Sequence, residues 1–414
     1  MKKLLLIIML AIPAGDSLLA CTSVIISGKV TQDGRPLMWK QRDNDSPRSK
    51  LLYLSEGNYD MIVLVNSTVT RPTAMYYGFN SAGFVIMNTM SYNIDPSEDA
   101  SSSRNGSIML QALRSCGSIA EFEEFLNSYE RPMMVQSNFG TIDAQGGAAY
   151  FEVNGEGYVK IDVNDQRVAP HGYVVRTNYS FTGTVNEGAG YIRFQTAENI
   201  FYKASGSGNL TVPFIVENVC RSLENSYTGQ NVRNYLDIPD GKDNFIYYQD
   251  CINRYTSSSS IVVQGVKPGE SPLLTTMWAI IGSPLSSMVV PVWLNEKKVL
   301  PSVVSSSGTE TPDVCEFSLI LKDHMVPSLR GSTKYYINTT KVFNANGTGI
   351  TQRIIPLEKQ IIARAEESLA AWRLEGRINQ SELVKLYDWV DTYVRDSYRE
   401  TFGLESAGKG RRGR

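Results

Sequence analysis

A cysteine near the start of the chain is the first candidate for chemistry. Cys21 follows Leu18-Leu19-Ala20, a short segment of the kind after which export peptidases cleave. Cleavage there would leave a thiol and an α-amine on one residue. The reference pKa of an α-amine is about 7.7–8.0 and that of a thiol about 8.5, so the amine can accept the thiol proton near neutral pH. We therefore expect Cys21 to be a nucleophile that carries its own base.

The residues before Cys21 have the pattern of a secretory signal peptide. Lys2 and Lys3 are followed by an apolar run from Leu4 to Ile12. We predict that residues 1–20 are removed and that the protein is exported, to the periplasm or the cell exterior. The sequence has no later apolar run of the length a transmembrane helix needs. Whether a signal peptidase or self-cleavage removes Ala20 is left open by the sequence.

The same tetrapeptide resembles a bacterial lipobox, in which the cysteine thiol is lipidated after cleavage. This gives an alternative from another class, a non-enzymatic surface lipoprotein anchored at Cys21. The residues that follow favour the nucleophile, because Cys21 to Gly28 is a β-branched run typical of a buried strand. An Asp33-Gly34 turn and a second strand from Pro36 to Lys40 complete a predicted hairpin. A lipid is not easily attached to a cysteine inside a fold.

Charged residues follow the second strand of this hairpin. A nearby Arg42 would favour the thiolate form of Cys21. Asp45, three residues further on, is the candidate for holding the α-amine, and Asp43 is a second candidate for that role. Taken alone, an arginine and an aspartate at this spacing are more often a solvated surface pair, so the motif depends on Cys21.

The order Cys21-Thr22-Ser23, hairpin, Arg42-Asp43-Asn44-Asp45 resembles the opening of the linear amide C–N hydrolases. These N-terminal-nucleophile (Ntn) hydrolases include choloylglycine hydrolases, penicillin V acylases and isopenicillin N acyltransferase-like proteins. The resemblance implies an α+β fold, an αββα sandwich of two antiparallel sheets between helical layers. It also implies that Cys21 is the nucleophile, that Arg42 lies beside its thiolate, and that Asp45 binds the α-amine.

Four later segments extend the resemblance in the same order. Residues 78–88 are similar to a G-x-N-x-x-G element whose following strand brings an oxyanion or substrate-binding group. Asn88 is the candidate here, with Thr89 or Met90 as alternatives. Residues 138–152 are similar to a hairpin of the core sheet, to which we assign a structural role.

Two further site residues come from the segments after residue 170. The strand 173–179 resembles the one that delivers an oxyanion-hole asparagine, which would be Asn178. By itself Asn178 is more often a turn former at a strand end. The segment Tyr191-Ile192-Arg193-Phe194 opens a predicted helix and resembles an element whose arginine points back to the nucleophile, here Arg193.

We expect one Ntn-hydrolase domain over residues 21–350 and helices over 351–403 that pack on it or form a subunit contact, so a homo-oligomer is an option. The first of these helices is predicted to begin at Leu357, directly after Pro356, and residues 404–414 form a basic tail. A polar loop over 94–108 is expected at the mouth of the site.

Composition excludes several classes of function. A formal net charge of −2 leaves no broad cationic field for nucleic acid. With only two histidines, His171 and His324, a His-rich metal site is excluded, and we expect neither a metal nor another cofactor. The remaining cysteines could form two disulfides or be buried free thiols; they are Cys116, Cys220, Cys251 and Cys315.

Together these features predict an exported cysteine Ntn-hydrolase that cleaves a linear, non-peptide amide through a Cys21 thioester. The small-molecule substrate would be an N-acyl amino acid, a penicillin-type amide or a bile-acid conjugate. An acyltransferase that resolves the same thioester with an amine is the nearest alternative. A Cys–His enzyme using His171 is a further reading, which no known spacing supports.

Overall fold

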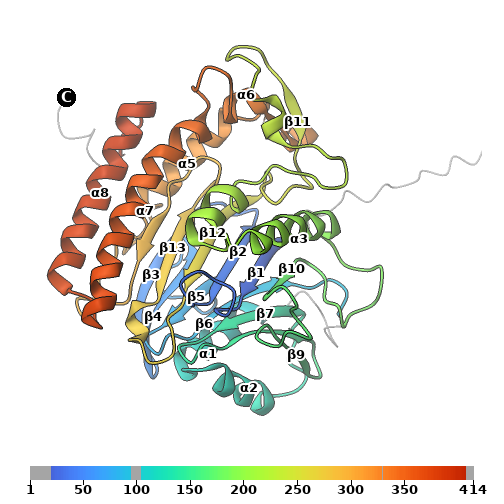
Figure 1. Cartoon of the computed structure of the whole chain (residues 1–414), viewed down its shortest axis with the longest axis vertical. Helices are drawn as coiled ribbons and strands as arrows, with labels where there is room; N and C mark the ends of the chain where they lie inside the picture. Colours follow the sequence, from blue (N-terminus) through green and yellow to red (C-terminus); the bar gives the residue numbers. More distant parts are fainter. Residues whose placement is uncertain (1–19, 95–103, 329, 407–414) are drawn as a thin grey trace, which may run out of the picture.

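The structure, a computed structural model, describes residues 20–94, 104–328 and 330–406 (Figure 1). Two antiparallel sheets pack face to face and helices cover both outer faces, so the predicted α+β sandwich is confirmed. The first sheet has the order β10-β1-β2-β12-β13-β14 and the second runs in sequence from β3 to β9. The strands of the first sheet are Tyr173–Arg176, Cys21–Ile26, Leu37–Asp43, Ser257–Gln264, Thr276–Ile281 and Val290–Val292. Those of the second are Ser49–Glu56, Tyr59–Asn66, Tyr77–Asn80, Val85–Met90, Ser137–Ile142, Ala148–Val153 and Tyr158–Asp162.

The hairpin of β1 and β2 carries the candidate nucleophile. Cys21 pairs with Arg42 and Ser23 pairs with Lys40 across the two strands. Gly34 in the connecting turn has φ +74°, a left-handed conformation that a glycine adopts without strain. Because side chains alternate along a strand, Cys21 and these three partners share one face of the sheet. That face is turned toward the second sheet, since the Ser23 hydroxyl is 2.9 Å from the Tyr150 hydroxyl of β8.

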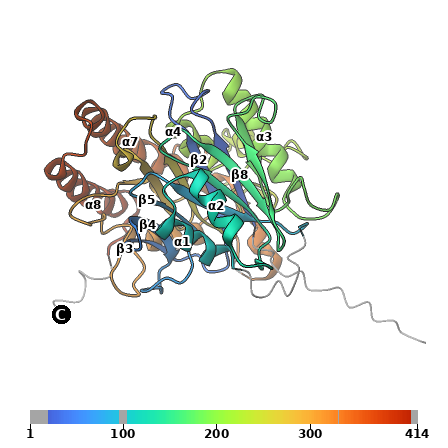
Figure 2. The ribbon, with the colours of Figure 1, turned by 90° about the horizontal axis from the view of Figure 1, so that it is seen from below.

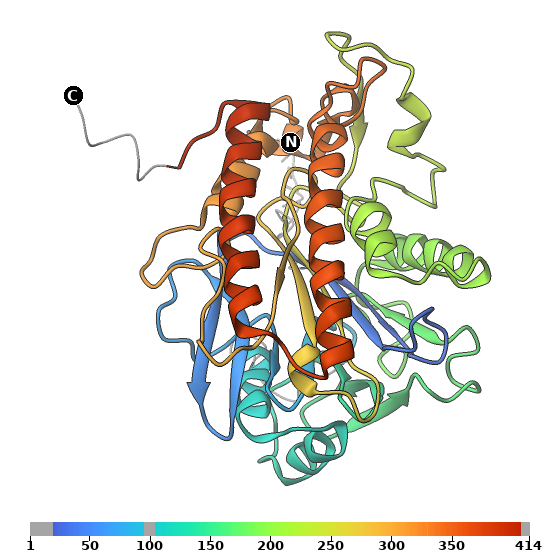
Figure 3. The ribbon, with the colours of Figure 1, turned by 60° about the vertical axis from the view of Figure 1, so that its left-hand side comes forward.

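The outer layers are unequal. Helices α1 (Asn105–Ser115) and α2 (Ile119–Ser128) lie on the second sheet (Figure 2), where the buried Phe122 of α2 packs against Phe139 and Phe151. The first sheet is covered by α3 (Tyr191–Gly206), α5 (Asp313–Asp323), α7 (Ile350–Glu375) and α8 (Gln380–Phe402). Figure 3 shows α7 and α8 side by side over this sheet.

The long helix α7 begins earlier than the sequence indicated. Pro356, which we expected to precede the helix, lies inside it, and α7 starts at Ile350. A proline lacks the N–H that would bond to the carbonyl of Gln352, one turn back, at a cost in stability. Burial of Ile350 and Ile354 explains why the helix continues through this position, because both side chains join the main core.

The cysteines are all free, and the four beyond Cys21 are buried, so the disulfide alternative is wrong for this structure. The polar loop expected over 94–108 lies largely outside the described residues, as do most of the predicted signal peptide and the end of the basic tail. In the part of the chain that the structure describes, no helix is long and apolar enough to cross a membrane.

Candidate active site

Cys21 is the first residue of β1 and lines a cavity of about 400 Å³ at the end of the hairpin. It is half-buried, whereas the preceding Ala20 is almost fully buried. The main-chain nitrogen of Cys21 donates a hydrogen bond to Asn178 Oδ1 over 2.8 Å. The residue is therefore fixed by its backbone at the edge of a space that a small molecule could enter.

Asn178 and Arg193 together hold the backbone of Cys21. Arg193 donates through Nη1 to the Cys21 carbonyl (2.6 Å) and to the Thr22 hydroxyl (2.7 Å), and through Nη2 to Asn178 Oδ1 (2.8 Å). Asn178 Nδ2 donates to the Met90 carbonyl over 2.8 Å. An arginine only donates and a carbonyl only accepts, so the orientation of the Asn178 amide is determined by its partners.

The role expected of Asn178 is therefore different in the structure. Its oxygen, not its N–H, faces the backbone nitrogen of Cys21, and its Nδ2 is bonded to Met90. This arrangement makes Asn178 Oδ1 an acceptor for the Cys21 nitrogen, a role that the sequence did not predict. Sequence indicates which residue ends the strand but carries no information on which way an amide turns.

Arg42 is buried beside Cys21, and its hydrogen-bond partners among the described residues are neutral. Its Nη atoms donate to the hydroxyls of Ser49 (3.1 Å) and Ser258 (3.0 Å) and to Asn66 Oδ1 (3.1 Å). The guanidinium lies 3.6 Å above the ring of Tyr76, a cation–π contact. Burial lowers the pKa of Arg42, while the nearby Tyr76 and Cys21 act in the opposite direction. The guanidinium thus places a positive charge at the cavity that also contains Cys21.

The structure does not bring Asp45 to Cys21. Asp45 is exposed in the loop after β2, and Asn178 accepts the hydrogen bond from the Cys21 nitrogen instead. Asp43, the second candidate, is the buried carboxylate and lines the cavity. It accepts from Arg254 Nε (3.0 Å) and from the Ser257 hydroxyl (2.6 Å). Asp43 is buried and Asp45 is exposed because β2 extends through Asp43 and leaves Asp45 beyond the sheet.

Asn88, the predicted oxyanion or substrate-binding residue, is in the same cavity lining as Cys21, together with a residue that sequence reasoning missed. Asn88 Oδ1 accepts from Lys40 Nζ (3.1 Å), and Asn88 Nδ2 donates to the Ser137 hydroxyl (3.0 Å). Lys40 also lines the cavity. The alternation of β2 could have identified it, because Lys40 is two residues before Arg42 and so shares its face.

The charged groups around Cys21 are mainly cations without carboxylate partners. Burial lowers the pKa of Arg193 to about 10, with a further lowering by Arg254 and opposing contributions from Asp43 and Cys21. Burial likewise lowers the pKa of Lys40 to about 8. The rest of the cavity wall is partly apolar, and its apolar side chains are Val65, Val69, Ala74, Met75 and Met90.

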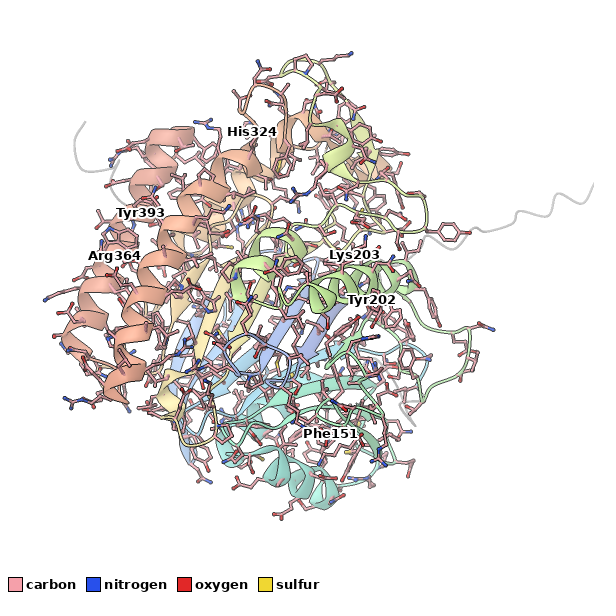
Figure 4. All side chains as sticks on the ribbon, in the orientation of Figure 1. Phe151, Tyr202, Lys203, His324, Arg364 and Tyr393 are labelled. Carbon is pink, nitrogen blue, oxygen red and sulfur yellow. The ribbon has the colours of Figure 1, made fainter. Side chains whose placement is uncertain are left out.

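Neither histidine is near Cys21. His171 is exposed and packs against Tyr202 of α3, which Figure 4 labels. It lies just before β10, at the end of the sheet where Ile26 pairs with Tyr173, so the length of β1 separates it from Cys21. The five residue steps from Cys21 to Ile26 span about 16 Å. His324 follows α5 near the α6 end of the molecule (Figure 4). A Cys–His pair is therefore excluded by the geometry.

Comparisons with known proteins add similarity at the level of the fold. No family model and no curated protein matches the sequence. Among solved structures, the chain is similar to penicillin V acylase from Agrobacterium tumefaciens, with 14% identity and a TM-score of 0.39 over 67% of this chain and 87% of that one. A mutant conjugated bile acid hydrolase from Clostridium perfringens is 11% identical, with a TM-score of 0.37 over 68% of this chain and 93% of that one.

A Caenorhabditis elegans ortholog of N-acylethanolamine-hydrolyzing acid amidase gives 12% identity and a TM-score of 0.36, over 47% of this chain and 87% of that one. All three similarities have TM-scores below 0.5 and identities below 15%. At such identities the roles of the residues in this chain rest on its own geometry.

Proposed function

We propose that this protein is a cysteine amide hydrolase in which Cys21, once residues 1–20 are removed, is the N-terminal nucleophile. The observation that carries the proposal is the bond from the Cys21 nitrogen to Asn178 Oδ1, beside a cavity that contains Cys21, Arg42 and Lys40. In the described chain this nitrogen belongs to the Ala20–Cys21 peptide. After cleavage the same nitrogen would be the α-amine, already oriented by an acceptor.

The proposed reaction has two halves. The α-amine takes the thiol proton, and the Cys21 thiolate attacks the amide carbon of the substrate. The tetrahedral oxyanion collapses, the C–N bond breaks, and the leaving amine takes a proton from the α-ammonium. Water then gives a proton to the α-amine and attacks the thioester, which releases the acid and restores the thiol.

The residues around Cys21 have distinct parts in this scheme. Asn178, held by Arg193, orients the amine. The positive charge of Arg42 favours the thiolate. Asn88, whose amide carries a second N–H besides the one bonded to Ser137, is the side-chain candidate for donating to the oxyanion.

We propose a small, linear amide as the substrate, in the classes of N-acyl amino acids, penicillin-type amides and bile-acid conjugates. A cavity of about 400 Å³ is near the lower end of the size range of small-molecule sites. Its apolar wall suits an acyl group, and the cations suit an anionic leaving portion. We also propose that the enzyme is exported and acts without a cofactor.

The test is turnover of a panel of N-acyl amino acids and phenoxymethylpenicillin by the processed protein, with detection of the released amine. We expect Cys21→Ala to abolish turnover while circular dichroism shows an unchanged fold. Cys251→Ala, at a buried cysteine away from the cavity lining, is the matched control and should keep full activity. Turnover that persists in Cys21→Ala would rule out this mechanism, and added amines that yield acylated products would indicate the acyltransferase alternative.

A further inference from the structure

Lys40 is not among the residues that the sequence motifs indicated, yet it lies in the same site as Cys21. It pairs with Ser23 in the β1–β2 ladder and so lies on the same face of β2 as Arg42. Its side chain is 3% exposed and lines the same cavity as Cys21. A lysine is seldom buried to this extent unless it is paired.

The partners of Lys40 are neutral. Nζ donates to the Tyr76 carbonyl (3.0 Å) and to Asn88 Oδ1 (3.1 Å). An ammonium group has three N–H donors, and these two bonds use two of them. Within the described residues Lys40 forms no ion pair with a carboxylate. Lys40 is thus a buried cation that no carboxylate of the described residues pairs with, and it lines the same cavity as a thiol that can become an anion.

We propose that Lys40 is a further positioning residue of the site, which holds Asn88 and stabilises negative charge on Cys21 Sγ through the electrostatic field of its ammonium group. This inference rests on the proposed function in one respect, that Cys21 reacts as a thiolate. No other residue so far assigned to the site combines a bond to Asn88 with a positive charge.

Several groups from the neighbouring elements face the same space. From β2 come Arg42 and Asp43, of which Asp43 is already bonded to Arg254. Tyr76, whose ring lies on Arg42, and Arg71 also line the cavity, whereas Arg193 of α3 and Tyr92 lie outside its lining and interact electrostatically with Cys21.

Lys40 changes charge near neutral pH, the range in which the reference pKa of the free Cys21 α-amine also lies. Burial lowers the pKa of Lys40 to about 8, the charge on Cys21 raises it, Arg42 lowers it and Asp43 raises it. Arg193, with a pKa of about 10, stays charged, and burial raises the pKa of Tyr92 so that it stays neutral.

The experiment measures the rate of alkylation of Cys21 by iodoacetamide as a function of pH, followed on the Cys21 peptide by mass spectrometry. The variants are Lys40→Met, Lys40→Arg and Lys322→Met, all as processed protein. Lys322 is the matched control, because it is a half-buried lysine whose pKa burial also lowers to about 8 but which bonds to the Tyr255 carbonyl and lies outside the cavity lining. We expect the midpoint of the pH–rate curve to rise by about one unit in Lys40→Met and to stay near the wild-type value in the other two. An unchanged midpoint in Lys40→Met would overturn the proposal, since a merely structural role would change stability and not this profile.

A reciprocal measurement covers the case in which Lys40→Met does not fold. Acetic anhydride labels Lys40 only when its amine is neutral, so the pH dependence of labelling reports its charge. In Cys21→Ala the midpoint for Lys40 should fall relative to the wild-type protein, and an equal midpoint would contradict the proposal. Neither readout needs an amide substrate. Shifted midpoints without turnover of any amide would therefore support the role of Lys40 and count against the proposed function.

Discussion

Two regions of this protein bury an arginine, and they do so in opposite ways. Beneath α7, Arg221 forms a bidentate pair with Glu358 (2.7 and 2.8 Å) and donates further to three main-chain carbonyls. At the Cys21 cavity, Arg42 bonds to two hydroxyls and one amide, and its Nε has no acceptor among the described residues. One guanidinium is saturated by a carboxylate and the other is not.

The pKa values move accordingly. Burial acts to lower the pKa of Arg221, but the charge and hydrogen bonds of Glu358 outweigh it and the pKa is raised. Burial lowers the pKa of Arg42, Arg193 and Lys40, and no carboxylate in the described part of the chain is bonded to them to oppose it. Arg221 is therefore a buried cation that joins a helix to the sheet. The positive charges of Arg42, Arg193 and Lys40 remain available to stabilise an anion.

The largest expected effect is on stability at the Arg221 site. Arg221→Met would leave the Glu358 carboxylate buried without its partner, so the free energy of unfolding should fall by about 3–5 kcal/mol. Urea denaturation followed by fluorescence measures this. The activity of the molecules that remain folded should be unchanged, and the double change with Glu358→Leu should recover most of the stability. A loss of kcat/KM without a loss of stability would erase the distinction between the two regions.

The matched change at the cavity, Arg42→Met, should lower activity more than it lowers stability. Arg42→Met removes a cation with neutral partners and leaves no carboxylate unpaired, so stability should change less than in Arg221→Met. We expect kcat/KM to fall by about 10²–10³-fold, the usual range for one electrostatic contributor in an active site. Released amine measured against substrate concentration tests it. Wild-type kinetics in Arg42→Met would show that its charge does not serve Cys21.

The acceptor for the Cys21 nitrogen gives the next effect. Asn178→Leu keeps the volume but removes the oxygen that receives hydrogen bonds from Cys21 and Arg193, and a displaced amine should lower kcat by about 10²-fold. Asn178→Asp retains an acceptor oxygen and should lose less. Equal losses in the two variants would indicate that the side chain acts through its N–H rather than its oxygen.

The smallest effect is expected at Asp45, which lies outside both regions. Asp45 is exposed beyond the end of β2, so Asp45→Ala should change stability by no more than about 0.5 kcal/mol and leave kcat/KM unchanged. Asp43→Asn, at the buried neighbour bonded to Arg254, should lower both. A large loss in Asp45→Ala would restore the role that the sequence motif implied.

The sequence contained enough to predict the first hairpin, the layers of the fold and the position of Cys21. β-branched residues, the Asp33-Gly34 turn and alternation predict local structure, and the order of motifs predicts the rest. It could not predict where β2 ends, and that boundary decides which aspartate is buried.

The finer details of the site depend on contacts between elements far apart in the chain. The amide orientation of Asn178 is determined by Arg193 and Met90, and neither partner is adjacent to it in sequence. Lys40 was overlooked because a lysine at a strand end is normally exposed, although its spacing from Arg42 was a usable signal. The second sheet buries Lys40, and this tertiary packing turns a lysine expected at the surface into a residue of the site.

The intact mass and N-terminal sequence of the protein purified from its natural export route test the central claim most directly. The account predicts a chain that begins at an unmodified Cys21, with a free thiol and a free α-amine beside Asn178. A chain that begins at a lipidated Cys21, or that retains residues before it, would remove the base from the proposed reaction and contradict the enzyme mechanism.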